Sequence, residues 1–186
     1  MPSAVHPAHQ RVLDAAGRKA VSLEIVIFDE GTHTAEEAAQ AVGAELGQIV
    51  KSLVFVSPVE GGLELVLALV SGANRVDVGR LSAVVGLTGL RRATAQEAHD
   101  LTGFVIGGIP PVGHHRTARV VMDPDLGRFT SVWAAAGTPN AVFQVPPGTL
   151  RILANATVAP IAVDTDVRSA AERVVAPLAG NAPAEA

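Results

Sequence analysis

The sequence contains no cysteine and no tyrosine among its 186 residues, and only 3% of them are aromatic. Without cysteine the chain has no disulfide, no thiolate ligand for a metal and no cysteine nucleophile. The scarcity of aromatic residues means that a core must be built from aliphatic side chains. Hydrophobic residues still make up 48% of the chain. This content argues against global disorder and suits one domain of ordinary size.

Long apolar runs are also missing. The longest ones, such as the segment LVLALV, are far shorter than the roughly 20 residues that span a membrane. The N-terminus has no basic stretch followed by an apolar one, so no secretory signal is visible and we expect a cytoplasmic protein without membrane contact. The net charge of −4 argues against binding of long nucleic-acid duplexes. It leaves open the recognition of a short single-stranded end.

The pattern of residues predicts one α/β domain over residues 1–186, with a core over about 6–164 and loose ends at 1–5 and 176–186. Two Thr-x-x-Glu capping boxes, at Thr34 and Thr94, predict helix starts. We expect helices over 6–17, 35–46, 78–85, 95–102 and 147–153, and strands over 23–28, 48–56, 63–70, 118–122, 129–133 and 141–145. A Glu-Gly-Gly turn predicts a hairpin between the second and third strands. This order favours a mixed sheet with packed helices over a doubly wound parallel fold.

Lys51 is one of only two lysines, against twelve arginines, and it lies inside the apolar run IVKSLVFV. Because side chains alternate along a strand, Lys51 shares a face with Ile49, Leu53 and Phe55. A cation on such a face extends to water, pairs with an anion or lines a polar cavity. An edge lysine with a packed stem and a solvated head is the alternative of equal weight.

The second unusual feature is the segment TGFVIGGIPPVG, residues 102–113. Adjacent glycines let a backbone approach a ligand closely, and successive prolines stiffen the chain that follows. Amides in such a loop can point at an anion or at a developing oxyanion. The composition by itself favours an ordinary connecting loop, since turns are the common use of glycine and proline.

Histidines offer weaker candidates. His6 and His9 are three residues apart, but no third ligand is evident, so we expect no metal. His114 and His115 follow the glycine-rich segment, where a solvated loop end is the simpler interpretation. No serine-elbow, Walker or Rossmann motif is present. Asn140, in a Gly-Thr-Pro-Asn turn, is a candidate polar contact.

The segments THTAEEAAQAVG, QIVKSLVF, TGFVIGGIPPVG and VVMDPDL, in this order, resemble the YbaK/EbsC family. These proteins are trans-editing aminoacyl-tRNA deacylases related to the editing insert of bacterial prolyl-tRNA synthetases. The resemblance covers residues 23–153. It is carried by the pairing of the strand lysine with the Gly-Gly-x-Pro-Pro-x-Gly loop, because neither motif is specific by itself.

The resemblance implies a curved, partly barrel-like mixed sheet and hydrolysis of a mischarged aminoacyl-tRNA in trans. Lys51 would match the family's essential lysine, which orients the aminoacyl-adenosine end, and the 107–111 loop would hold the ester region. The family uses no metal or organic cofactor, and its chemistry uses groups of the substrate. The implied partner is the tRNA 3′ acceptor end, with an aminoacyl-tRNA synthetase as a further candidate; the oligomeric state is open. The candidate substrate-binding residues are Phe28, Ser52, Gly107, Gly108, Ile109, Pro111, Gly113 and Asn140.

Two positions depart from the cysteine-specific members of the family. Phe28 stands where those proteins carry a tyrosine, and Val142 stands where they carry an aspartate. Both changes predict a less polar pocket for a small amino acid, such as alanine or serine, with no requirement for a thiol. Two other hypotheses remain open at this stage: a binding module that does not hydrolyse its ligand, and a hydrolase of another small ester.

Overall fold

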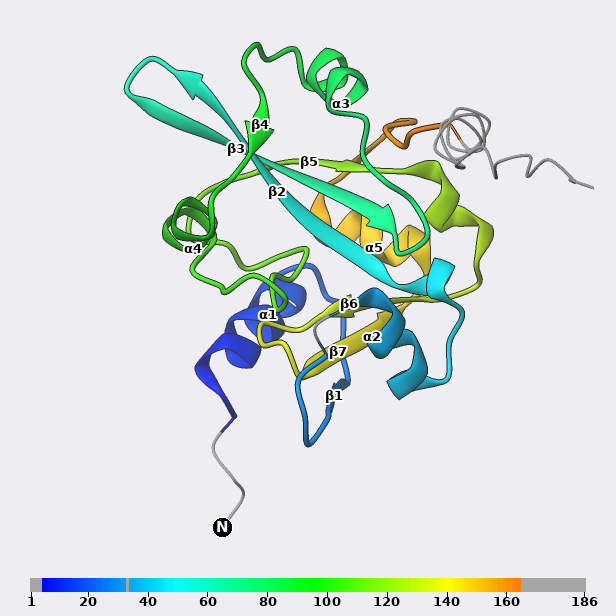
Figure 1. Ribbon diagram of the computed structural model, residues 1–186. Coiled ribbons are helices and arrows are strands. Elements are labelled where there is room, and N and C mark those ends of the chain that lie inside the picture. The colour runs from blue at the N-terminus through cyan, green and yellow to red at the C-terminus, as the bar shows by residue number, and fades with distance from the viewer. Residues whose placement is uncertain (1–4, 33, 165–186) are drawn as a thin grey trace, which may run out of the picture.

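The computed structural model describes residues 5–32 and 34–164, so the loose ends expected at 1–5 and 176–186 lie, except for Val5, outside the described residues. Over these residues the chain is a mixed α/β domain with two sheets (Figure 1). The helices are α1 (Pro7–Gly17), α2 (Ala35–Val42), α3 (Val78–Val85), α4 (Ala95–Thr102) and α5 (Pro147–Ala154), with 3₁₀ turns η1 (Leu46–Gln48) and η2 (Pro124–Arg128). The strands are β1 (Ile25–Ile27), β2 (Val50–Val59), β3 (Gly62–Ser71), β4 (Arg91–Arg92), β5 (Arg119–Met122), β6 (Val132–Ala135), β7 (Ala141–Val145) and β8 (Thr157–Val158).

The larger sheet has the strand order β4-β2-β3-β5-β8 and is built on the long β2–β3 hairpin. β2 and β3 pair antiparallel along their whole length, whereas β5 joins β3 in parallel, so the sheet is mixed. Apolar side chains cover both of its faces. Val54 and Val56 belong to one buried cluster, and Phe55 and Val66 belong to another. A sheet buried on both faces explains why its strands are nearly continuous apolar runs.

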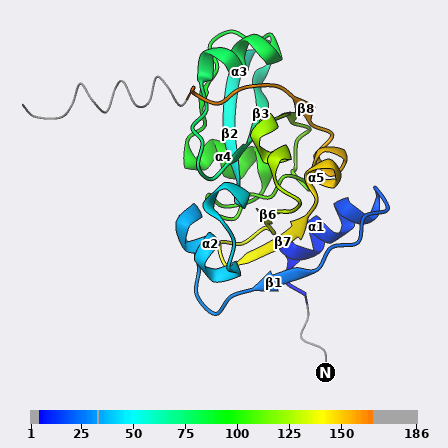
Figure 2. The same cartoon turned by 90° about the vertical axis from the view of Figure 1, so that its right-hand side faces the viewer.

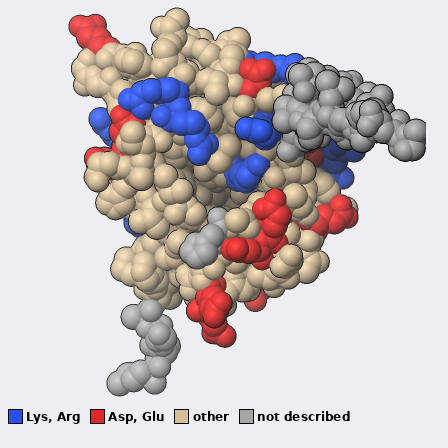
Figure 3. Space-filling view, viewed as in Figure 1, with Lys and Arg blue, Asp and Glu red and all other residues tan. Residues whose placement is uncertain are grey.

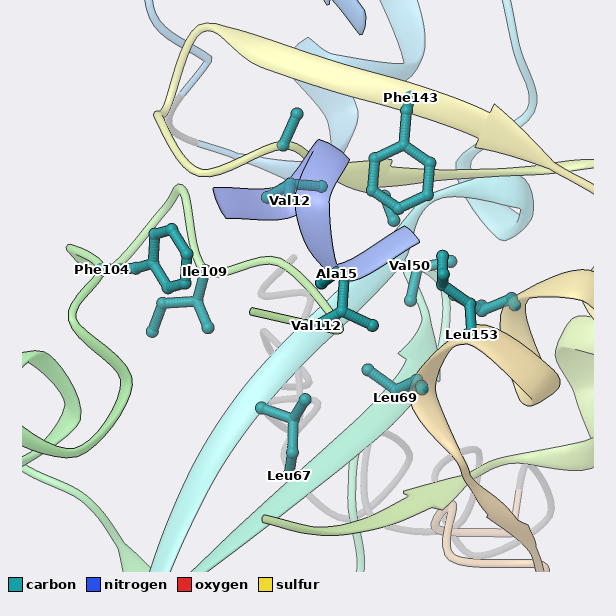
Figure 4. Packing of buried hydrophobic residues seen from close by; sticks show 14 of the residues in the cluster. Val12, Ala15, Val50, Leu67, Leu69, Phe104, Ile109, Val112, Phe143 and Leu153 are labelled. Carbon is teal, nitrogen blue, oxygen red and sulfur yellow. The ribbon is translucent and has the colours of Figure 1, made fainter. Parts of the chain in front are cut away.

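The smaller sheet has the order β1-β7-β6 and is antiparallel. It lies at the opposite end of the molecule from α3 (Figure 2). Helix α1 connects the two sheets, because Val12 and Ala15 pack between Phe143 of β7 and the β3 side chains Leu67 and Leu69 (Figure 4). All of these side chains except that of Ala15 are fully buried, so the two sheets share one aliphatic core.

The predicted mixed α/β class and the hairpin are confirmed. A curved, partly barrel-like sheet is not confirmed, since the strands of the described residues form two separate sheets. The strand expected over 129–133 is misplaced, because Phe129 caps the C-terminal end of the turn η2 and β6 starts only at Val132. The helix that begins after Thr34 is shorter than expected, since Gly43 adopts a left-handed conformation with φ 65°. No helix in the described parts of the chain is both long and apolar enough to cross a bilayer.

The side chain of Asp123 links the end of β5 to the segment after β8 through hydrogen bonds. The residue is 2% exposed. One carboxylate oxygen accepts the amide of Asp125 at 3.0 Å, and the other accepts those of Ile161 and Ala162 at 3.2 and 2.9 Å. A buried carboxylate with three amide donors has its desolvation cost offset by charge-assisted hydrogen bonds. Part of the VVMDPDL motif therefore has a structural role.

Replacing Asp123 by alanine leaves these amides without their acceptor. We expect Asp123→Ala to lower the free energy of unfolding by about 2–3 kcal/mol, the typical cost of breaking charge-assisted bonds in a buried site. Urea denaturation followed by circular dichroism measures this loss. Asp100→Ala, on the exposed side of α4, is the matched control and should stay within about 0.5 kcal/mol of the parent. Equal effects of the two changes would contradict the structural role of Asp123.

Candidate functional site

A cavity of about 240 Å³ opens where the two sheets meet. A parallel bridge between Ile49 and Trp133 joins the start of β2 to β6 at this point. The walls come from α2, the first half of β2, strands β6 and β7, and the 106–109 loop. Segments separated by about a hundred residues thus border one hollow, and its position is set by the junction of the sheets.

The wall contributed by β2 is an open strand edge. β4 pairs with β2 only at Phe55 and Val56, and the carbonyl of Val54 accepts the amide of Ala93 at 3.0 Å. Because backbone groups of alternate residues point to the same side of a strand, Ser52 turns its N–H and C=O toward the same edge, beyond the end of β4. The Ser52 hydroxyl is buried and has no hydrogen-bond partner among the described residues. An unsatisfied hydroxyl beside a cavity is consistent with a site for a polar ligand group.

Lys51 lies next to Ser52 on this strand and also borders the cavity. Its side chain is half-buried, and its ammonium donates a hydrogen bond to the carbonyl of Asn74. The Asn74 side chain in turn donates to Asp125 at 2.7 Å. The head group of Lys51 is therefore held by a defined partner, and it does not simply extend into water. Asp125, in the VVMDPDL motif, supports that partner from η2.

The glycine-rich loop approaches the cavity from the opposite wall, and Gly107 and Ile109 line it. Gly107 has φ 93°, a conformation that favours glycine. Gly108 packs directly on the backbone of Thr138, since a Cβ atom there would lie 2.6 Å from the Thr138 carbonyl carbon. The Gly108 amide already donates to the Val105 carbonyl at 3.0 Å, so it forms part of the turn. The double glycine is thus required for a left-handed turn followed by a close backbone contact.

Arg11 of α1 holds both ends of this loop. Its guanidinium donates to the carbonyls of Thr102, Gly103 and Gly113 at 2.8, 3.0 and 2.6 Å, and it lies 4.0 Å from the centre of the Phe104 ring. Burial lowers the pKa of Arg11 from its ordinary value. No local sequence signal marks this role, because the partners of Arg11 are about 90 to 100 residues away.

His114 fixes the middle of the loop. Its Nε2 atom is 2.7 Å from the carbonyl of Pro110, and the ring stands edge-on to Phe104. Burial lowers the pKa of His114, although the bond to Pro110 opposes that effect. A carbonyl oxygen can only accept, so a neutral imidazole that donates from Nε2 satisfies this contact. His114 therefore positions the loop, which sequence reasoning left open.

Of the residues predicted to form the site, the structure brings Lys51, Ser52, Gly107 and Ile109 to the cavity wall. Phe28 and Asn140 do not line it. The Phe28 amide donates to the Asn140 carbonyl at 2.8 Å, and the Asn140 side chain donates to the Phe28 carbonyl at 3.0 Å. These bonds support the neighbouring Pro139, which does line the cavity. The remaining predicted residues, Gly108, Pro111 and Gly113, shape the loop behind the wall.

The other histidines that the structure describes have structural partners. The rings of His6 and His9 are 5.1 Å apart, but His9 is buried and its Nε2 bonds to Thr138 at 2.8 Å. Burial, and to a smaller extent His6, lowers the pKa of His9. His115 packs against Gly103. Within the described residues there is no group of three or more His, Asp or Glu side chains that could hold a metal ion.

Sequence reasoning missed several residues of the wall. Thr32, Arg92 and Trp133 line the cavity, as does Val142, which had been named from the sequence. The amide and the hydroxyl of Thr32 both donate hydrogen bonds to the carbonyl of Pro139. The only available signal was rarity, because Trp133 is the single tryptophan of the chain. Phe28 is absent from the wall, so the apolar character expected of the pocket rests on Val142 and on small residues of α2, β6 and β7.

Comparisons with known proteins point to one family. A family model described as an aminoacyl-tRNA editing domain matches residues 29–153. The multifunctional Ser/Thr-tRNA deacylase ProXp-y of Escherichia coli K12 is 32% identical over 132 residues, which is 69% of this chain and 77% of that protein. A proline–tRNA ligase of Limosilactobacillus fermentum is 31% identical over 97 residues, which is 52% of this chain and 17% of the ligase.

A solved structure described as a candidate trans-editing enzyme for prolyl-tRNA synthetase shares 47% identity and a TM-score of 0.78, over 87% of this chain and all of that one. The family match covers well over half of this chain, and it includes both the β2 wall and the glycine-rich loop. The chain therefore belongs to the aminoacyl-tRNA editing domain family, as the resemblance to the YbaK/EbsC proteins predicted.

Proposed function

We propose that this chain hydrolyses the aminoacyl ester of mischarged tRNA in trans, and that Lys51 and the Gly107–Pro111 loop position the 3′ end. As an editing-domain protein similar to a Ser/Thr-tRNA deacylase and to a trans-editing enzyme, the chain is an aminoacyl-tRNA deacylase. The observation that carries the finer proposal is the shared cavity. Lys51 and Ser52 form one wall and Gly107 and Ile109 the other, although the two motifs are more than fifty residues apart.

The reaction does not require a dedicated side-chain base, because an aminoacyl ester is already activated. Holding the ester and a water in place and stabilising the developing oxyanion supplies much of the required acceleration. The ammonium of Lys51, fixed by the carbonyl of Asn74, places a positive charge where a phosphate or the ribose–ester region would lie. The stiff loop across the cavity keeps the ester at a constant distance from this charge. The ribose hydroxyl of the substrate can then assist the attack.

The cavity suits a small amino acid. Ala35, Ala38 and Ala135 provide short side chains, and Val142 makes this part of the wall apolar. The unsatisfied hydroxyl of Ser52 offers a polar contact beside these apolar side chains. Such a pocket accepts alanine and serine and has no group that requires a thiol. Apolar pockets discriminate between similar side chains by only about 1–3 kcal/mol per methylene group.

The first prediction concerns Lys51. We expect Lys51→Ala to reduce the single-turnover rate of deacylation by about 10²–10³-fold or more, the usual effect of losing one stabilising donor. Lys51→Arg should also be slow, because the planar guanidinium is larger and cannot present a compact charge at the same point. Rates measured on a substrate that the parent protein hydrolyses, together with thermal melts, separate loss of chemistry from loss of folding.

The matched control is Lys19→Ala, which changes the only other lysine, an exposed residue after α1. It should keep the parent rate and melting temperature. A near-normal rate for Lys51→Ala would eliminate the proposed role of Lys51. Tight binding of aminoacyl-tRNA by the parent protein without turnover of any substrate would favour a non-catalytic binding module.

The second prediction concerns the loop. We expect Gly108→Ala to slow deacylation by about 10²-fold, because a displacement of about 1 Å at a reacting centre has an effect of this size. The added methyl would overlap the backbone of Thr138, so the loop must move away from the cavity wall. Gly127→Ala is the control, since nothing lies within 4 Å of a Cβ atom at that position. Parent-like rates for both variants would contradict a positioning role for the loop.

The third prediction concerns specificity. In a panel of mischarged tRNAs, alanyl- and seryl-tRNA should both be hydrolysed, with rate constants within roughly 10²-fold of each other, because one apolar pocket discriminates weakly between small side chains. The measurement is the loss of labelled aminoacyl-tRNA under single-turnover conditions. Efficient hydrolysis of cysteinyl-tRNA alone would show that the pocket requires a thiol, against the apolar wall formed at Val142.

A further inference from the structure

A second groove of about 300 Å³ lies beside the cavity. Its walls carry three cationic side chains, those of Lys51, Arg75 and Arg92. Its apolar floor comes from Leu53 and Phe55 of β2, with Val76 at one side. Among the residues that the structure describes, no carboxylate lines the groove. The proposed editing chemistry uses only Lys51 of this set, so the two arginines have no role assigned by the cavity alone.

The groove and the cavity are continuous. Lys51, Leu53 and Arg92 border both of them. On β2, Lys51 pairs with Val70, which belongs to the apolar cluster on the α3 face of the sheet, whereas the neighbouring Ser52 and Val54 face the other way. The open edge of β2 therefore has the cavity on one side and the cationic groove on the other, with Lys51 at the boundary.

The two arginines of the groove differ from most other arginines on the described surface. Elsewhere on the surface arginines are paired: Arg91 with Glu97 and Arg119 with Glu64, each at 2.7 Å, and Arg80 with Asp164. Arg75 and Arg92 form no ion pair with any residue that the structure describes. Figure 3 shows basic side chains gathered around a hollow on this face, with acidic side chains mostly below it.

Arg92 is also held in position. Its guanidinium lies 5.2 Å from the centre of the Phe55 ring, a cation–π arrangement that restricts the side chain without neutralising its charge. A restricted, planar donor group suits contact with a phosphate. Arg75 is exposed and lines the same groove. The groove therefore has one ordered and one adaptable cation in addition to Lys51.

We propose that this groove binds the sugar–phosphate backbone of the single-stranded 3′ end of tRNA, with phosphates on Arg75 and Arg92. The inference rests on the proposed function, since that function places the terminal aminoacyl group in the adjoining cavity. A strand whose last ribose lies at Lys51 continues directly into the groove. A site of two or three cations is enough for a short single strand, and it is compatible with a net charge of −4 for the whole chain.

The test uses an uncharged acceptor-stem hairpin that ends in a single-stranded CCA, with binding followed by fluorescence anisotropy at several salt concentrations. We expect Arg75→Ala and Arg92→Ala each to weaken binding about fivefold or more at low salt. Each should also reduce the slope of log K against log salt by about 0.7, the value for one phosphate contact in a single strand. Arg92→Lys should recover the slope, because it keeps the charge.

Arg119→Ala is the matched control, because Arg119 is paired with Glu64 and borders neither hollow. It should bind like the parent. A blunt hairpin without the single-stranded end should bind weakly and equally to all variants. Parent-like affinity and salt slope for both Arg75→Ala and Arg92→Ala would overturn the proposal that the groove binds RNA. An equal loss of affinity for the blunt hairpin would also overturn it, because that hairpin has no single-stranded end. Thermal melts check that Arg92→Ala folds without its contact to Phe55.

The two proposals fail in distinguishable ways. Because the hairpin carries no ester, its binding does not depend on catalysis. Single-turnover deacylation by the parent protein tests the proposed function separately. In the same assay Arg75→Ala, which changes a residue that lines the groove and not the cavity, should raise the enzyme concentration at half-maximal rate and leave the maximal rate within about twofold, as expected for a contact made equally before and during the reaction. A fall in the maximal rate alone would count against a role in binding RNA.

Discussion

The site depends on a strand edge that is left open at one place. β2 is paired with β3 over its full length, but on its other side β4 covers only Phe55 and Val56. The uncovered half of β2 carries Lys51 and Ser52 on opposite faces, and both reach the same edge. An unpaired edge usually has to be protected, because its amides and carbonyls invite a partner strand. Here the loop and α2 enclose it, and the enclosed space is the cavity.

Several side chains outside the cavity wall hold this edge and the loop in position. The Asp123 carboxylate, at the end of β5, accepts a backbone amide of η2. Asp125 accepts a hydrogen bond from the Asn74 side chain, and the Asn74 carbonyl accepts one from Lys51. On the other side, Arg11 and His114 bind loop carbonyls. These hydrogen bonds fix the positions of Lys51 and of the glycine-rich loop at the cavity. The chemistry proposed for the cavity relies on such pre-organisation and not on a dedicated base.

The elements that the sequence predicted well are those with a local cause. The Thr94 capping box places α4 because its hydroxyl and the Glu97 carboxylate cap each other's backbone amides, at 3.2 and 2.9 Å. The β2–β3 hairpin follows from two nearly continuous apolar runs on either side of a Gly-Gly turn. Lys51 was identified because a cation inside an apolar strand needs an explanation, and Gly107 because adjacent glycines let a backbone approach a ligand closely.

What the sequence could not give depends on contacts between distant segments. Arg92 joins the site only because the two-residue strand β4 pairs with β2, and so short a strand has no periodicity to detect. Phe28 was expected at the pocket from a family position, yet its backbone bonds to Asn140 keep it behind the wall. The start of β6 was misplaced because Phe129, a good strand former, instead caps a 3₁₀ turn.

The most direct test of the proposed site is a crystal structure of the protein with a non-hydrolysable amide analogue of 3′-aminoacyl-adenosine. The aminoacyl group should lie in the cavity between Ser52 and Val142, with its carbonyl against the Gly107–Ile109 backbone. The ammonium of Lys51 should lie within hydrogen-bond distance of the ribose or of the amide that replaces the ester. An analogue bound in this cavity with Lys51 still directed only at Asn74, or bound elsewhere on the protein, would contradict the proposed site.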